Sequence, residues 1–136
     1  MSNDRQPSCK ERVRAEYRRE IATIRKLWEQ YVANPEAHDD EYGNWTEHGL
    51  CFAYVPPGTD QKRGFFRYQI STGGPGDEFR FYCDERLQLT RVEYWFLDWF
   101  DGAKVVVNGA ARKLCDEIWA DWLECEVPQS AMKSAE

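Results

Sequence analysis

Hydrophobic residues near the N-terminus of the chain recur with helical spacing. Ser8 and Glu11 have the spacing of a capping box, in which a hydroxyl and a carboxylate satisfy the first free amides of a helix. The apolar stripe beyond them consists of Val13, Tyr17, Ile21, Ile24, Leu27, Trp28 and Tyr31. It covers about 120° of a helical wheel, as in an amphipathic helix. Pro35 disfavours helical geometry at Asn34, so we expect this helix to end there.

Segments in the middle of the chain alternate hydrophobic and polar residues with period two, which predicts strands. The segments are residues 50–55, 65–71, 77–84 and 89–100. Short turns rich in proline and glycine, Pro56-Pro57-Gly58 and Gly73–Gly76, follow the first two. Connections this short make consecutive strands antiparallel neighbours. We therefore predict a four-stranded antiparallel meander, with Asp101-Gly102 closing the fourth strand.

A second helical stripe lies near the C-terminus. Asn108 offers an N-cap, and Pro128 stops the pattern. The stripe consists of Ala111, Leu114, Cys115, Ile118, Trp122 and Cys125. The preceding residues 105–107 fit either a short extended piece or the entry to this helix.

The order of these elements predicts an α+β fold. An N-terminal and a C-terminal helix would pack against one face of the meander. We expect one domain spanning residues 1–136, with residues 1–7 and 129–136 as frayed tails. Residues 35–48 carry acids and no Lys or Arg, and they fit a short helix or an irregular loop.

Composition restricts the classes of function. The chain has 136 residues, enough for one domain with a true core, and a net charge of -6, which argues against direct binding to nucleic acid. Its first residues are polar, unlike a signal peptide, and no apolar run is long enough to span a membrane. The 5 cysteines include no Cys-x-x-Cys pair, so we expect free thiols in a cytoplasmic protein.

Aromatic and basic residues remain after the core is assigned. If the sheet buries Phe66 and its same-face neighbours, the other face carries Arg67, Arg80, Tyr82, Trp95 and Trp99. An exposed patch of this kind predicts a protein-binding site. Two alternatives remain open: the arginines stack on the tryptophans and cover them, or residues 35–48 fold across this face.

The C-terminal helix offers further candidate binding residues. Trp119 and Leu123 are four residues apart and can touch, so they could anchor a partner or a homodimer. Acids cluster around them, and a second cluster contains Asp39, Asp40, Glu41 and Glu47. Together the clusters could attract a basic groove, although solvated surface charge also explains them.

No arrangement of residues typical of catalysis emerges. His48 follows Glu47 and precedes Cys51 by three residues, but strand alternation would separate the thiol from the imidazole and no third group orients them. Asp98 has acidic neighbours near the end of the fourth predicted strand, but carboxylates at such spacing are common in any acidic domain. We predict that the chain is not an enzyme and uses no cofactor or metal ion.

Several segments resemble a known group of proteins. They are residues 54–59, 64–69, 73–81 and 91–103, including Tyr-Val-Pro-Pro-Gly-Thr and Gly-Gly-Pro-Gly-Asp-Glu-Phe-Arg-Phe. They are similar to short uncharacterised accessory proteins carried on plasmids and phages, over roughly residues 42–125. The resemblance implies a protein that blocks host machinery, such as a restriction or CRISPR system.

These observations together predict a non-catalytic cytoplasmic protein from a mobile genetic element. It would inhibit a host defence or nucleic-acid-processing protein through acidic and aromatic surface, and that surface suits a basic partner. One alternative is an immunity protein or antitoxin that neutralises a basic toxin. Another is a small-molecule-binding domain or small enzyme with a pocket between helices and sheet that contains His48 or Asp98.

Overall fold

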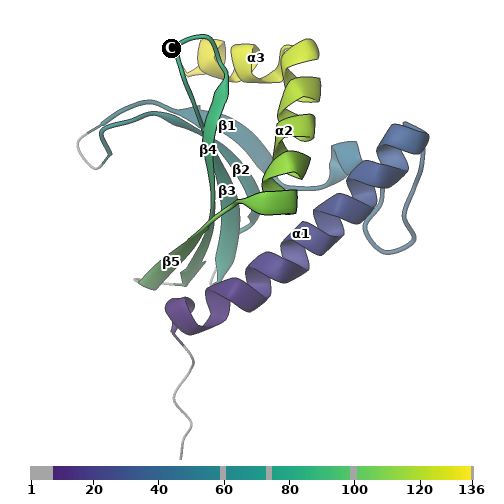
Figure 1. The fold of residues 1–136 in the computed structure, drawn as a ribbon, viewed down its shortest axis with the longest axis horizontal. Helices are drawn as coiled ribbons and strands as arrows, with labels where there is room; N and C mark the ends of the chain where they lie inside the picture. Colours follow the sequence, from purple (N-terminus) through teal and green to yellow (C-terminus); the bar gives the residue numbers. More distant parts are fainter. Residues whose placement is uncertain (1–7, 59–60, 73–74, 99–100, 136) are drawn as a thin grey trace, which may run out of the picture.

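A computed structural model describes residues 8–58, 61–72, 75–98 and 101–135 of the chain. These residues form three α-helices, a short 3-10 helix and a five-stranded antiparallel sheet (Figure 1). The elements are α1 (Cys9–Ala33), η1 (Trp45–Glu47), β1 (Cys51–Val55), β2 (Phe65–Ser71), β3 (Gly76–Cys83), β4 (Leu89–Asp98), β5 (Asp101–Val106), α2 (Gly109–Glu124) and α3 (Val127–Ser134). Strand order follows chain order, so the sheet is a meander. The predicted α+β class is confirmed.

The sheet has one strand more than the sequence predicted. β4 ends at Asp98, and Asp101 and Gly102, which we expected to close that strand, instead begin β5 and pair back onto β4. Val105 and Val106, which we left undecided between an extended piece and a helix entry, belong to this strand. The prediction of four strands was wrong because the alternating pattern continues across the chain reversal, so periodicity alone did not show where one strand ends.

The C-terminal residues also differ from the prediction. We expected a frayed tail from residue 129, but Val127–Ser134 forms α3, which lies against the edge strand β1 (Figure 1). α2 ends at Glu124, before Pro128, and Pro128 occupies the first turn of α3, where a missing amide hydrogen costs no helical bond. Glu126 has a φ of 59° and turns the chain between the two helices. The other predicted tail, residues 1–7, lies outside the described residues.

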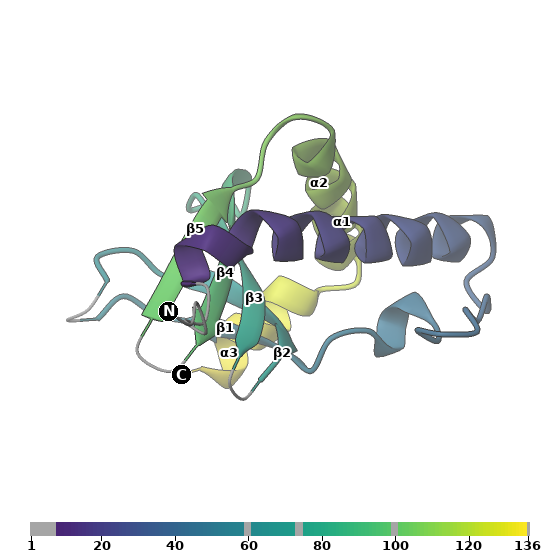
Figure 2. The ribbon, with the colours of Figure 1, turned by 90° about the horizontal axis from the view of Figure 1, so that it is seen from below.

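The two long helices lie on the same side of the sheet (Figures 1 and 2). α1 begins where the Ser8 side chain accepts a hydrogen bond from the Glu11 amide, and it ends before Asn34, as predicted. One part of α1 covers β4 and β5, and its C-terminal part extends toward η1 and α2. No helix among the described residues is long and apolar enough to cross a membrane.

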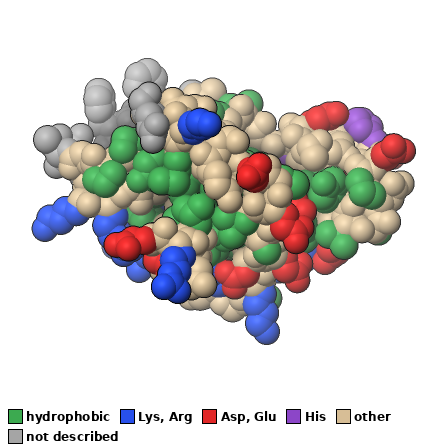
Figure 3. Space-filling view, turned by 90° about the horizontal axis from the view of Figure 1, so that it is seen from above, with side chains coloured by type: hydrophobic (Ala, Val, Ile, Leu, Met, Phe, Trp, Pro, Cys, Tyr) green, Lys and Arg blue, Asp and Glu red, His purple; other side chains and the backbone are tan. Residues whose placement is uncertain are grey.

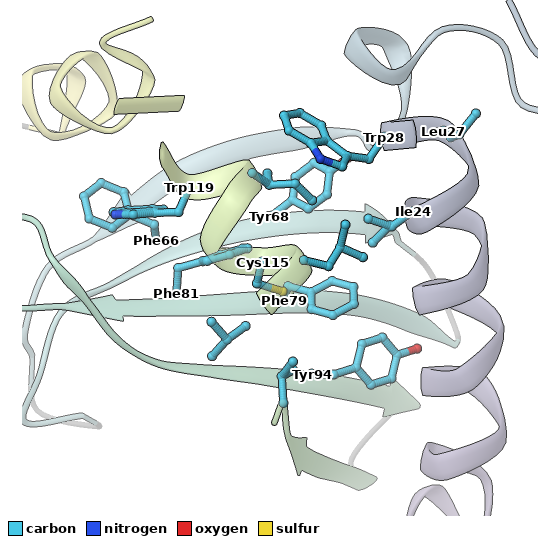
Figure 4. Packing of buried hydrophobic residues seen from close by; sticks show 14 of the residues in the cluster. Ile24, Leu27, Trp28, Phe66, Tyr68, Phe79, Phe81, Tyr94, Cys115 and Trp119 are labelled. Carbon is cyan, nitrogen blue, oxygen red and sulfur yellow. The ribbon is translucent and has the colours of Figure 1, made fainter. Parts of the chain in front are cut away.

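A continuous aromatic core fills the space between sheet and helices (Figure 4). The sheet supplies Phe66, Tyr68, Phe79, Phe81, Val92, Tyr94 and Phe96, and the helices supply Ile24, Leu27, Trp28, Leu114, Cys115, Ile118 and Trp119. The Tyr94 hydroxyl donates a 2.7 Å hydrogen bond to Asp77, which satisfies a polar group in this core. Burial, followed by this bond to Asp77, raises the pKa of Tyr94. The strand residues in this core are those that alternation placed on the inner face of the sheet, so this part of the prediction is confirmed.

Candidate functional site

The outer face of the sheet carries most of the predicted aromatic patch, but its own side chains cover part of it. The Arg80 guanidinium lies 4.0 Å from the centroid of the Trp95 ring and 4.7 Å from that of Phe65. Its Nε also pairs with Glu78 at 2.7 Å. Arg67, which is opposite Arg80 in the register of β2 and β3, is half-buried. The alternative in which an arginine stacks on a tryptophan therefore holds at Trp95.

Glu93 connects the remaining groups of this face. Its carboxylate, 3% exposed, accepts hydrogen bonds from Trp95 Nε1 at 3.0 Å and from Arg91 Nε at 2.7 Å. The Tyr82 hydroxyl donates at 3.2 Å and Lys104 Nζ at 3.4 Å. Burial alone would raise the pKa of Glu93, but the bonds from Trp95 and Arg91 and the nearby ammonium lower it overall. These polar groups therefore bind one another in an internal hydrogen-bond network centred on Glu93.

The predicted anchor on α2 is wrong for Trp119. This side chain is 3% exposed, stacks on Phe81 at a centroid distance of 5.6 Å and donates its indole N–H to the Leu87 carbonyl at 2.8 Å. It belongs to the core because the β3–β4 turn covers the side of α2 that the helical wheel left open. Leu123 is half-buried and packs against the core. Trp99 lies outside the described residues.

Asp39 is a structural residue and not part of an exposed acidic cluster, contrary to our expectation. It is 7% exposed and accepts hydrogen bonds from Gln30 at 3.1 Å and from the Glu41 amide at 3.0 Å. Lys26 pairs with the same carboxylate at 3.0 Å. The Gln30 bond, followed by the Lys26 bond, holds the pKa of Asp39 well below its usual range. Asp39 thus fastens residues 35–44 to α1.

Other acidic side chains of the two predicted clusters have neither a hydrogen bond nor an ion pair within the described part of the chain. They are Glu36, Asp40, Glu41, Glu47, Asp121, Glu124 and Glu126. In contrast, Asp116 pairs with Arg112, and Glu117 accepts a hydrogen bond from the Trp28 indole. Figure 3 shows red acidic side chains predominating over blue ones toward one end of the molecule.

The two acidic segments meet in space through their tryptophans. Trp45 in η1 is 5% exposed, packs edge-on against Trp28 at 5.7 Å and stacks with Trp122 of α2 at 6.4 Å. Asn44 positions η1 because its side chain accepts a hydrogen bond from the Thr46 amide. The sequence showed each cluster separately, but their meeting depends on this aromatic contact between distant segments.

A pocket of about 420 Å³, which we call the His48 pocket, lies at this meeting point. Its lining residues are Tyr31, Trp45, Thr46, His48, Gly49, Leu50, Cys51, Phe52, Tyr68, Asp121, Trp122, Cys125 and Val127. Aromatic rings from α1, η1, β2 and α2 form much of the wall, and the Tyr68 hydroxyl donates to the His48 carbonyl at 2.9 Å. Residues 35–48 therefore lie on the helical side of the sheet and not across its outer face.

His48 has a carboxylate neighbour that the sequence did not indicate. Its Nε2 lies 3.8 Å from a Glu20 oxygen of α1, and both atoms are buried without a hydrogen bond. The sequence offered only the preceding residue, Glu47, as an acid beside His48. Cys51 lines the same pocket as His48, although we expected alternation to separate them, because His48 precedes β1 and strand geometry does not govern it. In the sequence, Glu20 lies one helical turn before the core residue Ile24. This spacing was the available signal that the Glu20 side chain faces the inside of the molecule.

The remaining acid that we considered for chemistry lies outside this pocket. Asp98 pairs with Arg12 at 3.2 Å and is absent from the lining. No cluster of three or more His, Cys, Asp or Glu side chains in the described ranges is arranged to hold a metal ion. Cys51 and Cys125 are both exposed free thiols.

No protein family model matches the chain, and no curated protein or solved structure is significantly similar to it. The resemblance to accessory proteins of plasmids and phages therefore stays a prediction, and the geometry of the acidic end of the molecule is the basis for a function.

Proposed function

We propose that the chain is a non-catalytic cytoplasmic protein that binds and inhibits a basic, nucleic-acid-processing protein of a host cell. The observation that carries this proposal is the meeting of two acidic segments at one end of the fold. Seven of their carboxylates have no hydrogen bond or ion pair within the described part of the chain, so their charge is available to an outside ligand. The sequence resemblance adds the expectation that a mobile element encodes the protein.

Electrostatics favours a basic partner for this surface. The chain carries a net charge of -6, and a surface rich in carboxylates presents a negative field similar in kind to that of a phosphate backbone. A protein groove that binds nucleic acid would be attracted to such a field. Carboxylates on the surface do not by themselves give tight binding, so the aromatic His48 pocket supplies the apolar contact area that an interface needs.

Affinity purification with mass spectrometry from the host cell tests this function. The bait is the wild-type chain, compared with a variant carrying Asp40→Asn, Glu41→Gln and Glu47→Gln. Asp39 is left intact because it fastens the loop to α1. We expect a stoichiometric basic protein to accompany the wild type and to be strongly reduced with the variant.

A second triple variant provides the control for total charge. Glu16→Gln, Glu29→Gln and Glu85→Gln remove the same charge outside both acidic segments and outside the pocket lining. Retention of the partner by this control, with its loss from the first variant, would support the acidic surface. Equal binding by all three chains, or no stoichiometric partner, would contradict the proposal. A partner encoded beside this chain's own gene would indicate an immunity protein or antitoxin instead.

A further inference from the structure

Two arginines of the chain share one arrangement: each lies over an aromatic ring and pairs with a carboxylate. Arg80 lies over Trp95 at 4.0 Å and pairs with Glu78. Arg12 lies over the Phe96 ring at 4.7 Å and pairs with Asp98 at 3.2 Å. A guanidinium is flat and always charged, so it can stack on a ring while its N–H groups bind an acid.

The His48 pocket contains the ring and the carboxylate of this arrangement but no arginine. Trp122 and Tyr31 are half-buried rings in its wall, and Asp121 lines it one residue before Trp122. The Asp121 carboxylate has no hydrogen bond or ion pair among the described residues. The described lining contains neither lysine nor arginine.

Charge around the pocket has the same sign as Asp121. Glu47 lies between the lining residues Thr46 and His48, and Glu124 precedes the lining residue Cys125. Leu50, which also lines the pocket, is 60% exposed, so apolar surface is open to solvent beside these acids. An apolar pocket with an acid in its wall, and with further acids next to its lining residues in the sequence, is complementary to a side chain with an apolar stem and a cationic end.

We infer that the His48 pocket receives an arginine side chain of the basic partner protein. The inference rests on the proposed function and names the chemistry that its central contact recognises. The guanidinium would stack on the aromatic wall and donate hydrogen bonds to Asp121, as Arg80 and Arg12 do inside the chain. Arginine suits this role better than lysine because its planar group serves the ring and the carboxylate together.

Titration of the full chain with matched peptides, followed by NMR, tests the inference. The probes are capped peptides of glycine and serine with two arginines, and the same peptides with lysine or with citrulline, which keeps the shape and removes the charge. We expect the arginine peptide to bind at least several-fold more tightly than either. Its strongest shifts should include the Trp122 indole.

Two variants with the same change of charge localise the contact. Asp121→Asn should weaken binding of the arginine peptide about tenfold. Asp116→Asn, on the same helix and outside the pocket lining, should change it less than about twofold because this acid is exposed and already paired with Arg112. Circular dichroism verifies that both variants fold.

Other outcomes separate this inference from the proposed function. If lysine and arginine peptides bind equally, or if the two variants weaken binding equally, the acidic surface attracts cations but the pocket does not select arginine, and the inference fails alone. Tighter binding of free arginine amide than of the peptide would instead indicate a small-cation site and would also overturn it. If Asp121→Asn binds an isolated basic partner as tightly as the wild type does, the inference is overturned while the proposed function survives without this contact.

Discussion

The guanidinium of Arg80 lies 4.0 Å from the centroid of the Trp95 ring, on the outer face of the sheet. The same side chain pairs through Nε with the buried carboxylate of Glu78 at 2.7 Å. The arginine therefore satisfies a buried charge and covers an aromatic ring at once. This relationship explains why a sheet face with many aromatic residues does not present them all to a partner.

Replacing Arg80 with alanine should therefore destabilise the fold. Arg80→Ala leaves Glu78 buried without its cation and uncovers Trp95, so we expect a loss of about 2–4 kcal/mol in the free energy of unfolding. Urea unfolding followed by fluorescence measures this. Arg86→Ala, at an exposed position in the β3–β4 turn, should cost less than about 0.5 kcal/mol. Equal effects of the two substitutions would contradict the role given to Arg80.

Trp119 should act on stability and not directly on partner binding. Trp119→Ala removes a ring packed between Phe66 and Phe81, and we expect it to cost about 3–5 kcal/mol. Trp119→Phe keeps an aromatic ring but loses the hydrogen bond to the Leu87 carbonyl, so it should cost less. Urea unfolding compares the two. If both variants unfold like the wild type but lose a partner, Trp119 would be an interface residue after all.

Helix ends and strand faces were predictable because they depend on local chemistry. Ser8, Glu11 and Asn34 determine the ends of α1 through hydrogen bonds and backbone preferences within a few residues. Alternation in β2 to β4 likewise identified which aromatic residues face the helices. The reversal between Asp98 and Asp101 was missed because residues on both sides of it fit a strand equally well.

The end of the molecule where we propose partner binding was only partly predictable because distant segments form it. Sequence identified the acidic clusters, including Asp40, Glu41 and Glu47, but not that Trp45 and Trp122 bring them together. It also counted Asp39 as surface charge, since nothing local shows that Lys26 and Gln30 lie beside it. Contacts of this kind follow from packing of whole elements.

Gly49 should tolerate no side chain. Its φ is +85°, and a Cβ there would lie 2.6 Å from the Tyr68 ring, whose hydroxyl holds the His48 carbonyl. Gly49→Ala should cost about 2–3 kcal/mol in the free energy of unfolding. Gly58→Ala is the matched control because a Cβ at Gly58 meets nothing within 4 Å, and we expect a change below about 0.5 kcal/mol. Thermal and urea unfolding of both variants measure the difference, and similar losses would argue against the close approach at Gly49.

Asp39 should make stability depend on pH in the acid range. Its pKa is lowered in the folded chain, so between that value and the unfolded value of about 3.9 only the unfolded chain binds the proton. The free energy of unfolding should therefore rise with pH across this window. The contribution of Asp39 is fully present above the window, and it is lost as acid protonates the folded carboxylate. Urea unfolding from pH 2 to pH 7 should show Asp39→Asn less stable than the wild type at neutral pH, with the gap narrowing as the pH drops below about 4. Asp40→Asn, at an exposed neighbour, should change the free energy of unfolding by less than about 0.5 kcal/mol at neutral pH. A gap for Asp39→Asn that is equally large at pH 2 and pH 7 would mean that Gln30 and Lys26 do not favour its charged form.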